Sequence, residues 1–320
     1  MLRRLRLWFE YARPFTLLPP LLGMVSGAVT AYGAEARALG GLAEVWRRHG
    51  AHDLLWVAVG ALMAATLNAA SNILNQLCDL ENDRVNKPHR PLPSGRIGRG
   101  ETVALFSALY AAALALAWTI RPRGARECFW LVLAAAVMTV LYSVPPFRFK
   151  RFGLLANLTI ALPRGGLLKV AGWSLVGRVF GDVEPWFIGA AFFLFLLGAT
   201  TSKDFADMEG DRRAGCRTIP VRYGVRRAAW MSAPFFVVPW LLFPLGTWLR
   251  RDGGRAVLSG NPGILAGLGV VLFLYGGYVA WLMVRRPEAL ATEGENHPSW
   301  THMYRMMMVA QVGLAVAYVV

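Results

Sequence analysis

The sequence predicts an all-α integral membrane protein with nine transmembrane helices. Of its 320 residues, 56% are hydrophobic, and the mean hydropathy is +0.42, which lies outside the range of an ordinary soluble domain. The apolar residues gather in nine segments, most of them near the ~20 residues that cross a bilayer as a helix. Lys and Arg residues concentrate in alternate loops, as expected when those loops share one side of a membrane.

The expected spans, in chain order, are 17–32, 54–77, 102–120, 129–144, 154–176, 186–201, 228–249, 263–284 and 303–320. The first, fourth and last are short, so their ends are the least defined. Residues 1–16 mix basic and apolar side chains, which predicts an interfacial helix; the start of a signal peptide is the alternative. Within the fifth span, Pro163, Gly165 and Gly166 predict a helix that is broken where it lines a cavity.

The distribution of basic residues predicts the orientation. With the N-terminus inside, the inner segments hold 22 Lys and Arg residues and the outer loops hold ten. This favours a cytoplasmic N-terminus, in the plasma (inner) membrane of a prokaryote. The basic outer loop 121–126 is an exception. Positive inner loops and anionic lipid headgroups explain the net charge of +15, so membrane lipid is an expected partner and nucleic acid is not.

The three cysteines, Cys78, Cys128 and Cys216, form no CxxC pair and are odd in number. They predict free thiols and neither a disulfide framework nor a zinc site. Nothing in the sequence predicts an oligomeric state.

An acidic stretch follows the second span. Asn75, Asp79 and Asp83 are spaced by four, so on a helix their side chains share one stripe. Carboxylates at a helix C-terminus are disfavoured by the macrodipole, which points to a bound cation. Oxygen ligands select a hard ion, and Mg²⁺ is typically held by one or two carboxylates plus substrate phosphates. A solvated acidic helix end is the alternative.

A second acidic stretch follows the sixth span and repeats the first. It contains Asp204, Asp207 and Asp211. Asp207 and Asp211 follow Asp79 and Asp83 by 128 residues, and Arg212 follows Arg84 by the same offset. After a one-residue deletion, Arg90, Leu92 and Pro93 pair with Arg217, Ile219 and Pro220. The repeat predicts an internal duplication that presents both carboxylate clusters to one central cavity.

Further candidates follow the fourth span. Pro145 and Pro146 end the helix and leave Tyr142 near the cytoplasmic end of the cavity, with Arg148 and Lys150 just beyond. The Tyr142 ring is a candidate for stabilising a carbocation through its quadrupole. The two basic residues are candidates for binding phosphate, although anchoring on the inner side would also explain them.

Two charged residues lie inside the fifth span. Arg164 and Lys169 are functional candidates because a charge at this depth is expensive. A pyrophosphate or the acidic stretches could neutralise them. Snorkelling of Lys169 to the interface, or a structural ion pair, is the alternative.

The motifs resemble those of the UbiA superfamily of intramembrane prenyltransferases. The matching segments are ARPFT at 12–16, NQLCDLEND at 75–83, NKPHRPLPSGRI at 86–97, YSVPPFRFK at 142–150 and KDFADMEGDRRAGCRTIPVRYG at 203–224. They occur in family order across about two thirds of the chain. The resemblance implies a single domain over 1–320, a ring of nine helices around a central cavity that opens to the cytoplasm and laterally to lipid. Its pseudo-repeats cover about 1–150 and 151–285, followed by the final helix 303–320.

The resemblance also assigns roles to residues. By position, two aspartate motifs hold Mg²⁺ and an isoprenoid diphosphate through Asn75, Asp79, Asp83, Asp204, Asp207 and Asp211. Contacts to the diphosphate are expected from Arg90, Lys203, Arg148 and Lys150, in addition to Arg164 and Lys169. The expected catalytic residues are Asp79, Asp83, Asp207, Asp211 and Tyr142.

The implied reaction is Mg²⁺-dependent transfer of a prenyl group from a polyprenyl diphosphate to a membrane-associated acceptor. Gln76, directly after Asn75, resembles the homogentisate-type branch, whereas RPLPSGRI at 90–97 resembles branches that prenylate glyceryl phosphates or chlorophyllide. An aromatic quinone precursor is the favoured acceptor over those two. Cyclisation or diphosphate loss without an acceptor is one alternative, and a secondary transporter is another, since transporters also carry internal repeats and intramembrane charges.

Overall fold

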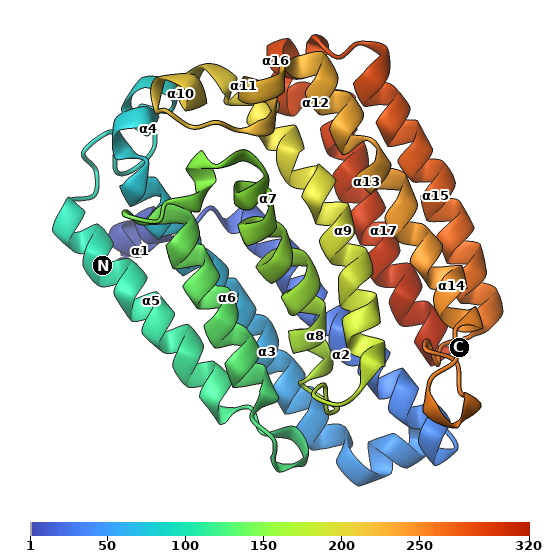
Figure 1. Ribbon diagram of the computed structural model, residues 1–320. Helices are drawn as coiled ribbons and strands as arrows, with labels where there is room; N and C mark the ends of the chain where they lie inside the picture. Colours follow the sequence, from blue (N-terminus) through green and yellow to red (C-terminus); the bar gives the residue numbers. More distant parts are fainter. Residues whose placement is uncertain (1) are drawn as a thin grey trace.

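The computed structural model describes residues 2–320 and is built of helices (Figure 1). The long helices are α2 (Leu18–Leu39), α3 (Leu42–Cys78), α5 (Arg99–Thr119), α6 (Glu127–Ser143), α9 (Val183–Ala206), α15 (Pro262–Arg285) and α17 (Pro298–Val319). Two further long units are composite: α7 (Gly153–Ala161), η4 (Leu162–Leu167) and α8 (Leu168–Trp173); and α12 (Val225–Ser232), α13 (Pro234–Val237), η5 (Val238–Leu241) and α14 (Leu242–Trp248). The predicted all-α class is confirmed.

Short helices occupy the ends of the bundle. They are α1 (Leu2–Tyr11), η1 (Pro14–Leu17), α4 (Leu80–Asn86), η2 (Pro122–Gly124), η3 (Phe149–Arg151), α10 (Met208–Arg213), α11 (Ile219–Tyr223), η6 (Asp252–Gly254), α16 (Ala289–Glu293) and η7 (Gly294–Asn296). Figure 1 shows α4 and α10 together at one end of the molecule, where they are in contact although they are far apart in the sequence. We call this the α4–α10 end.

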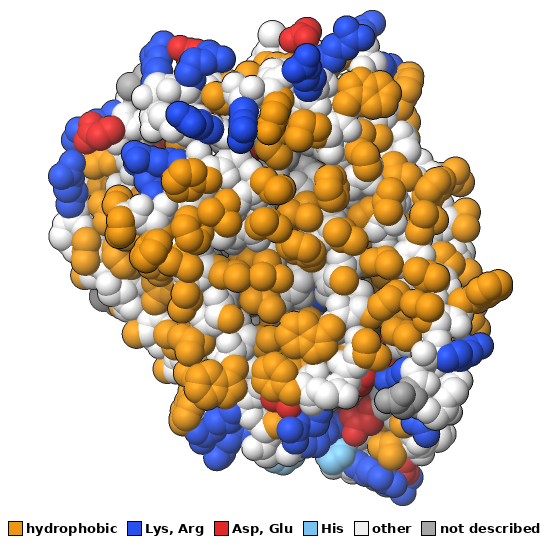
Figure 2. All heavy atoms as spheres, viewed as in Figure 1, with side chains coloured by type: hydrophobic (Ala, Val, Ile, Leu, Met, Phe, Trp, Pro, Cys, Tyr) orange, Lys and Arg blue, Asp and Glu red, His pale blue; other side chains and the backbone are white. Residues whose placement is uncertain are grey.

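Seven helical units among the described residues are long and apolar enough to cross a membrane. They are Pro14–Leu39, Leu42–Cys78, Arg99–Thr119, Gly153–Trp173, Val183–Ala206, Val225–Trp248 and Pro262–Arg285. The apolar helix α6 has only 17 residues, and α17 has 22 but includes Arg305 and Gln311. The predicted count of nine is therefore not confirmed. Figure 2 shows apolar side chains across the middle of one face and Lys and Arg at its two ends, as expected for an integral membrane protein.

The fifth span is not broken, contrary to the prediction from its sequence. The chain passes from α7 to α8 through the π-helical segment η4 without leaving a helical path. The ring of Pro163 removes a backbone donor, and a π-helical turn accommodates this locally. Gly165 lies against α9, because a Cβ there would be 2.6 Å from the carbonyl oxygen of Phe192. The Pro-Arg-Gly-Gly sequence thus widens the helix and packs it closely on α9.

The basic loop 121–126 has local partners. The Arg123 guanidinium lies 2.7 Å from a carboxylate oxygen of Asp53 and also pairs with Glu35. The Arg126 guanidinium lies 3.7 Å from the centre of the Trp118 ring. The charge of Arg123 is neutralised by acids on α2 and α3, which explains a basic loop on the side where few positive charges were expected.

Candidate active site

Each acidic stretch contains a kink at its central aspartate. Asp79 (φ −103°, ψ 10°) separates α3 from α4, and Asp207 (φ −99°, ψ 3°) separates α9 from α10. After each kink, a backbone N–H donates to the carbonyl oxygen of the aspartate at the kink. Asp83 donates to Asp79 and Asp211 donates to Asp207, both at 2.8 Å. Each stretch therefore extends over two helices that meet at the kink. The two aspartates that the sequence repeat pairs have the same backbone conformation.

Both stretches border a single cavity of about 690 Å³. The predicted site residues that line it are Asn75, Asp79, Asp83, Arg90, Tyr142, Lys150, Arg164, Lys169, Lys203, Asp204, Asp207 and Asp211. Arg148 is the one predicted site residue not found among the described lining residues; its guanidinium pairs with Asp79. A cavity of this size fits a small-molecule substrate.

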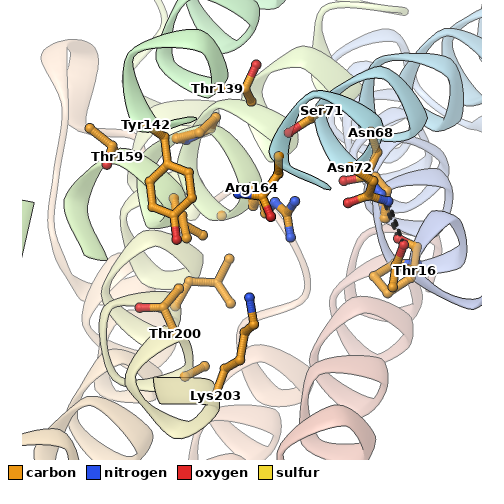
Figure 3. Close-up of a pocket in the computed structure, with 18 of the residues that line it drawn as sticks. Thr16, Asn68, Ser71, Asn72, Thr139, Tyr142, Thr159, Arg164, Thr200 and Lys203 are labelled. Atoms are coloured by element: carbon orange, nitrogen blue, oxygen red, sulfur yellow. Dashed lines mark hydrogen bonds between the residues drawn. The ribbon is translucent and has the colours of Figure 1, made fainter. Parts of the chain in front are cut away.

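Figure 3 shows how polar side chains from separate helices surround this space. Tyr142 of α6, Arg164 of η4 and Lys203 of α9 point into it from different sides. Asn72 of α3 lies opposite, beside Thr16. The cavity therefore combines polar groups from both halves of the chain.

Carboxylates of the first stretch are neutralised by cations. Asp79 contacts Lys150 and lies 3.2 Å from a guanidinium nitrogen of Arg148. Asp83, only 5% exposed, has a carboxylate oxygen 2.7 Å from a nitrogen of Arg90. Burial lowers the pKa of Lys150 to about 8. These cations hold the acidic side chains in place at the α4–α10 end.

The second stretch is less well neutralised. Asp207 lies 3.2 Å from the Lys87 ammonium, an ion pair that joins the two halves. Within the described chain, Asp204 and Asp211 form no ion pair. Burial and, secondly, the negative charge of Asp207 raise the pKa of Asp211 to about 6. This stretch therefore holds an excess of negative charge that a cation would stabilise.

Some cations that face the cavity have no ion-pair partner among the side chains that the structure describes. They include Lys203 and Arg164. Arg164 is enclosed by protein, yet more than a third of its surface is accessible because it borders the cavity. Uncompensated cations next to an apolar wall are suited to binding an anionic ligand.

The donor set fits a hard divalent cation, although no cage is preformed. In the described part of the chain, no three Asp, Glu, His or Cys side chains converge as a metal site. Asp79, Asp83 and Asp207 instead contact Lys or Arg. Oxygen donors of this kind suit Mg²⁺, which commonly binds through few carboxylates together with substrate phosphates and water. The arrangement is therefore compatible with Mg²⁺ that binds together with a phosphate-bearing substrate.

Lys169 lies deeper than the aspartates. Its ammonium donates to the Ser26 hydroxyl at 2.8 Å and lies 4.5 Å from the centre of the Phe192 ring. Phe192 precedes Lys203 on α9 by eleven residues, which is ~16 Å along a helix axis. The structure therefore does not bring Lys169 to the level of the aspartates, and its predicted contact with a diphosphate has no geometric support.

Gln76 has a structural role outside the cavity. Its amide donates to the backbone oxygen of Tyr11 at 3.0 Å, and it is 2% exposed. Asn72, one turn earlier, donates to the Ala12 oxygen and to the Thr16 hydroxyl. These amides hold residues 11–16 against α3. Gln76 is therefore not placed to contact a prenyl acceptor in the cavity.

Asn68 and Asn72 are lining residues that the sequence analysis missed. Asn68 donates to the Thr16 carbonyl oxygen at 2.9 Å, one turn before Asn72. The spacing of four between Asn68, Asn72 and Gln76 is the signal that could have revealed this polar stripe.

Comparison with known proteins identifies the family. The model of the UbiA prenyltransferase family matches residues 38–293. Chlorophyll synthase of Oryza sativa subsp. japonica is 29% identical over 52% of this chain and 44% of its own length. Digeranylgeranylglyceryl phosphate synthase of Methanothermobacter thermautotrophicus is 30% identical over 59% of this chain and 63% of its own length. The chain thus spans about half the length of these curated relatives.

A solved structure shares the fold. The UbiA homologue from Archaeoglobus fulgidus, solved with GPP and Mg²⁺, superimposes with a TM-score of 0.70 at 21% identity, covering 98% of this chain and 99% of that one. At this identity the likeness concerns the fold alone. The family match, by contrast, extends over most of the sequence and includes both acidic stretches. The chain therefore belongs to the UbiA prenyltransferase family.

Proposed function

We propose that this protein transfers a prenyl group from a polyprenyl diphosphate to a lipophilic, membrane-associated acceptor in a Mg²⁺-dependent reaction. The observation that carries the proposal is the meeting of two distant aspartate stretches, with basic side chains, at one end of a single membrane-embedded cavity. Family membership supports it, as do the names of the curated relatives and the GPP and Mg²⁺ bound by the homologous structure.

In this proposal the diphosphate binds at the α4–α10 end. Lys203 is already unpaired, and Arg90, Lys150 and Arg148 can turn from their carboxylates to the diphosphate oxygens when a metal takes their place. The side chains that would hold Mg²⁺ are Asn75, Asp79, Asp83, Asp204, Asp207 and Asp211. When bound, Mg²⁺ supplies positive charge that stabilises the departing diphosphate.

The chain's own residues act on charge and on water. The allylic C–O bond breaks, the diphosphate leaves with the electron pair, the acceptor bonds to the allylic carbon, and the acceptor loses a proton. The basic side chains stabilise the negative charge on the leaving group. The Tyr142 ring, which borders the cavity, is proposed to stabilise the allylic cation. Apolar walls exclude water that would otherwise capture it.

The structure gives no support for an aromatic acceptor over the other two classes. The preference for an aromatic quinone precursor depended on Gln76, which binds the Tyr11 backbone and does not border the cavity among the described residues. The two curated relatives are named for chlorophyll and for a glyceryl phosphate lipid. All three acceptor classes therefore belong in the test of function.

The test is an acceptor screen with purified protein in lipid, Mg²⁺ and prenyl diphosphates of several lengths. The panel contains quinone-precursor aromatics, glyceryl phosphates and chlorophyllide, and products are detected by mass spectrometry. A prenylated product that disappears on chelation of Mg²⁺ is the expected result. Diphosphate release with only a cyclised hydrocarbon would favour cyclisation, and substrate flux across sealed vesicles without diphosphate release would favour a transporter.

We also propose that the α4–α10 end and the N-terminus face the cytoplasm of a prokaryotic cell. The excess of Lys and Arg in the segments at this end supports that orientation. Protease cleavage in inside-out vesicles tests it: sites engineered into the exposed segment around Gly95 are expected to be cut there and protected in right-side-out vesicles.

A further inference from the structure

Four exposed arginines lie at the ends of two neighbouring helical units, each long and apolar enough to span a membrane. Arg226 and Arg227 are in the first turn of α12, where one of these units begins. Arg285 is the last residue of α15, where the other unit ends, and Arg286 follows it. All four residues are exposed. We call these four residues the arginine rim.

The packing of the two units brings both pairs of arginines to the same level. The units are consecutive in the chain, and α12, α13, η5 and α14 all contact α15, so the units run antiparallel. They are closest at Gly276, where a Cβ would collide with the Phe236 backbone oxygen. Arg285 follows Gly276 by nine residues and Arg227 precedes Phe236 by nine, which is ~13 Å along each axis. Figure 1 shows α12 at the α4–α10 end of the molecule.

The arginine rim has no acidic partner in the part of the chain that the structure describes. None of its four members forms an ion pair with a described side chain. The acids that follow α15 in the sequence, Glu288 and Glu293, are exposed and do not pair with the rim. The Arg285 guanidinium lies 4.2 Å from the centre of the Trp281 ring, a contact that leaves its charge in place. Four positive charges are therefore available to an external anion.

Several exposed arginines in the first half of the chain have acidic partners instead. The pairs are Arg4–Glu101, Arg84–Glu81, Arg96–Glu10 and Arg99–Glu81. A carboxylate beside a guanidinium reduces the field that an anionic surface would meet. Exposed arginine alone therefore does not distinguish the arginine rim; its lack of carboxylate partners does.

The surroundings of the arginine rim favour a phospholipid as the source of that anion. Trp230 and Trp281 lie one turn from the arginines, toward the middle of the two units, and are 60% and 49% exposed. Leu274 and Val271 continue an exposed apolar surface along α15. An anionic headgroup can meet the arginines while its acyl chains lie along these side chains. An acidic protein outside the membrane would contact the arginines without using this apolar surface.

We infer that the arginine rim binds the phosphate of an anionic phospholipid, whose acyl chains pack on the outer surfaces of α12 and α15. None of the four arginines is among the described residues that line the central cavity. The lipid site is therefore separate from the proposed position of the prenyl diphosphate. It also does not depend on the proposed function, because no step of prenyl transfer enters the inference.

The test is photo-crosslinking of lipids to the full chain in phosphatidylcholine vesicles. Each sample contains the same small fraction of photoactivatable phosphatidylglycerol or photoactivatable phosphatidylcholine, and mass spectrometry locates the cross-links. In the wild-type protein, cross-links within residues 225–231 and 278–286 are expected to favour phosphatidylglycerol by at least ~3-fold. Raising NaCl to ~0.5 M should lower this preference, because salt screens exposed charges.

Removal of the rim charges should remove the preference for phosphatidylglycerol. The fourfold variant carries Arg226→Gln, Arg227→Gln, Arg285→Gln and Arg286→Gln, and its preference is expected to fall below ~1.5-fold. Lysine at the same four positions keeps the charge and should retain at least about half of the preference. If the fourfold glutamine variant does not fold, Arg227→Gln combined with Arg285→Gln should still lower the preference measurably, because it removes one charge from each unit.

A matched control removes the same net charge elsewhere on the surface. It carries Arg4→Gln, Arg84→Gln, Arg96→Gln and Arg99→Gln, all exposed arginines with carboxylate partners. Cross-linking of phosphatidylglycerol at the arginine rim should stay within ~1.5-fold of the wild-type value in this control. The comparison separates a local lipid site from the general positive charge of the protein.

Three outcomes would overturn the inference. Equal cross-linking of the two lipids at the rim of the wild-type protein would mean that the rim does not recognise an anionic headgroup. An unchanged preference in the fourfold glutamine variant would assign it to other residues. Rim-dependent binding of a soluble polyglutamate peptide, without any preference for phosphatidylglycerol, would assign the surface to an acidic protein partner.

Discussion

Asp83 and Asp211 follow the same backbone kink, 128 residues apart, but they have different neighbours. Asp83 is buried and pairs with Arg90 from its own half. Asp211 forms no ion pair among residues 2–320, and burial together with Asp207 raises its pKa to about 6. Asp83 in the first half is thus neutralised by a cation, whereas Asp211 in the second half retains its negative charge. The repeat preserves the backbone geometry, whereas the charges around the two aspartates differ.

The largest effects are expected from the aspartates at the two kinks. Asp79→Ala and Asp207→Ala should each lower Mg²⁺-dependent prenyl transfer by at least ~100-fold, because each removes a carboxylate that would hold the Mg²⁺ needed to stabilise the leaving diphosphate. Turnover is measured by mass spectrometry on folded protein in lipid. The matched controls are Glu81→Ala and Glu209→Ala, also 128 residues apart, whose side chains are 74% and 63% exposed. Normal turnover in either aspartate variant would contradict the assignment.

A second prediction compares arginines that the repeat pairs. Arg90→Met should lower kcat/KM for the prenyl diphosphate by ~10- to 100-fold, because it removes a cation at the site and leaves buried Asp83 unpaired. Arg217→Met should change it by less than ~3-fold, because Arg217 is exposed and forms no ion pair in the described chain. Equal losses of kcat/KM in Arg90→Met and Arg217→Met would show that the two halves contribute equally to the use of the prenyl diphosphate.

The third prediction concerns pH and Asp211. Its folded pKa of about 6 is above the ordinary value of 3.8, so the folded state binds this proton more tightly than the unfolded state does. The stability gained from the proton is present below about pH 4 and is lost as pH rises through about 6. Above pH 6 the ionised carboxylate is costly, and Mg²⁺ bound to it would offset that cost.

Mg²⁺ should therefore raise Tm by ~2–4 °C more at pH 7.5 than at pH 5.5. Asp211→Asn should raise Tm without Mg²⁺ at pH 7.5 and remove this pH dependence. Thermal unfolding in detergent provides the measurement. The same pH dependence in Asp211→Asn would assign the titration to another group.

The smallest effect is expected at the ion pair that joins the halves. Lys87 and Asp207 lie 3.2 Å apart and are each about a quarter exposed on their side chains. If Lys87 competes with Mg²⁺ for Asp207, Lys87→Met should lower the Mg²⁺ concentration for half-maximal activity by ~2- to 5-fold. A higher requirement for Mg²⁺ would instead indicate that Lys87 contacts the diphosphate.

Sequence patterns predicted which residues line the cavity better than they predicted the path of the helices that carry them. The aspartate stretches and Lys203 could be found because carboxylates and amines are rare beside apolar spans, and the repeat linked them. The kinks at Asp79 and Asp207 could not be predicted, because spacing by three or four residues fits a straight helix equally well. The sequence predicted a break at Pro163, where the structure has a π-helical turn, for a related reason. Proline indicates a disturbed helix but does not specify whether the helix breaks or forms a π-helical turn.

Other errors concern partners that are distant in the chain. The link between Gln76 and the prenyl acceptor depended on its position next to Asn75. In the structure Gln76 contacts the Tyr11 backbone, 65 residues earlier. Arg123 looked misplaced until the fold brought Asp53 to it. Lys169 was assigned by charge alone, and only the packing of α8 against α2 and α9 reveals its depth. Such contacts depend on tertiary structure, which local spacing does not encode.

The central claim is that the two aspartate stretches form one binding site. A double-mutant cycle on Mg²⁺-dependent binding of geranylgeranyl diphosphate tests it most directly, with Asp79→Asn, Asp207→Asn and the double variant in the same lipid. We expect each single variant to lose the Mg²⁺-dependent component, and the double variant to bind no more weakly than the weaker single one. Losses that add in the double variant would mean that the two stretches act independently, and would contradict a shared site.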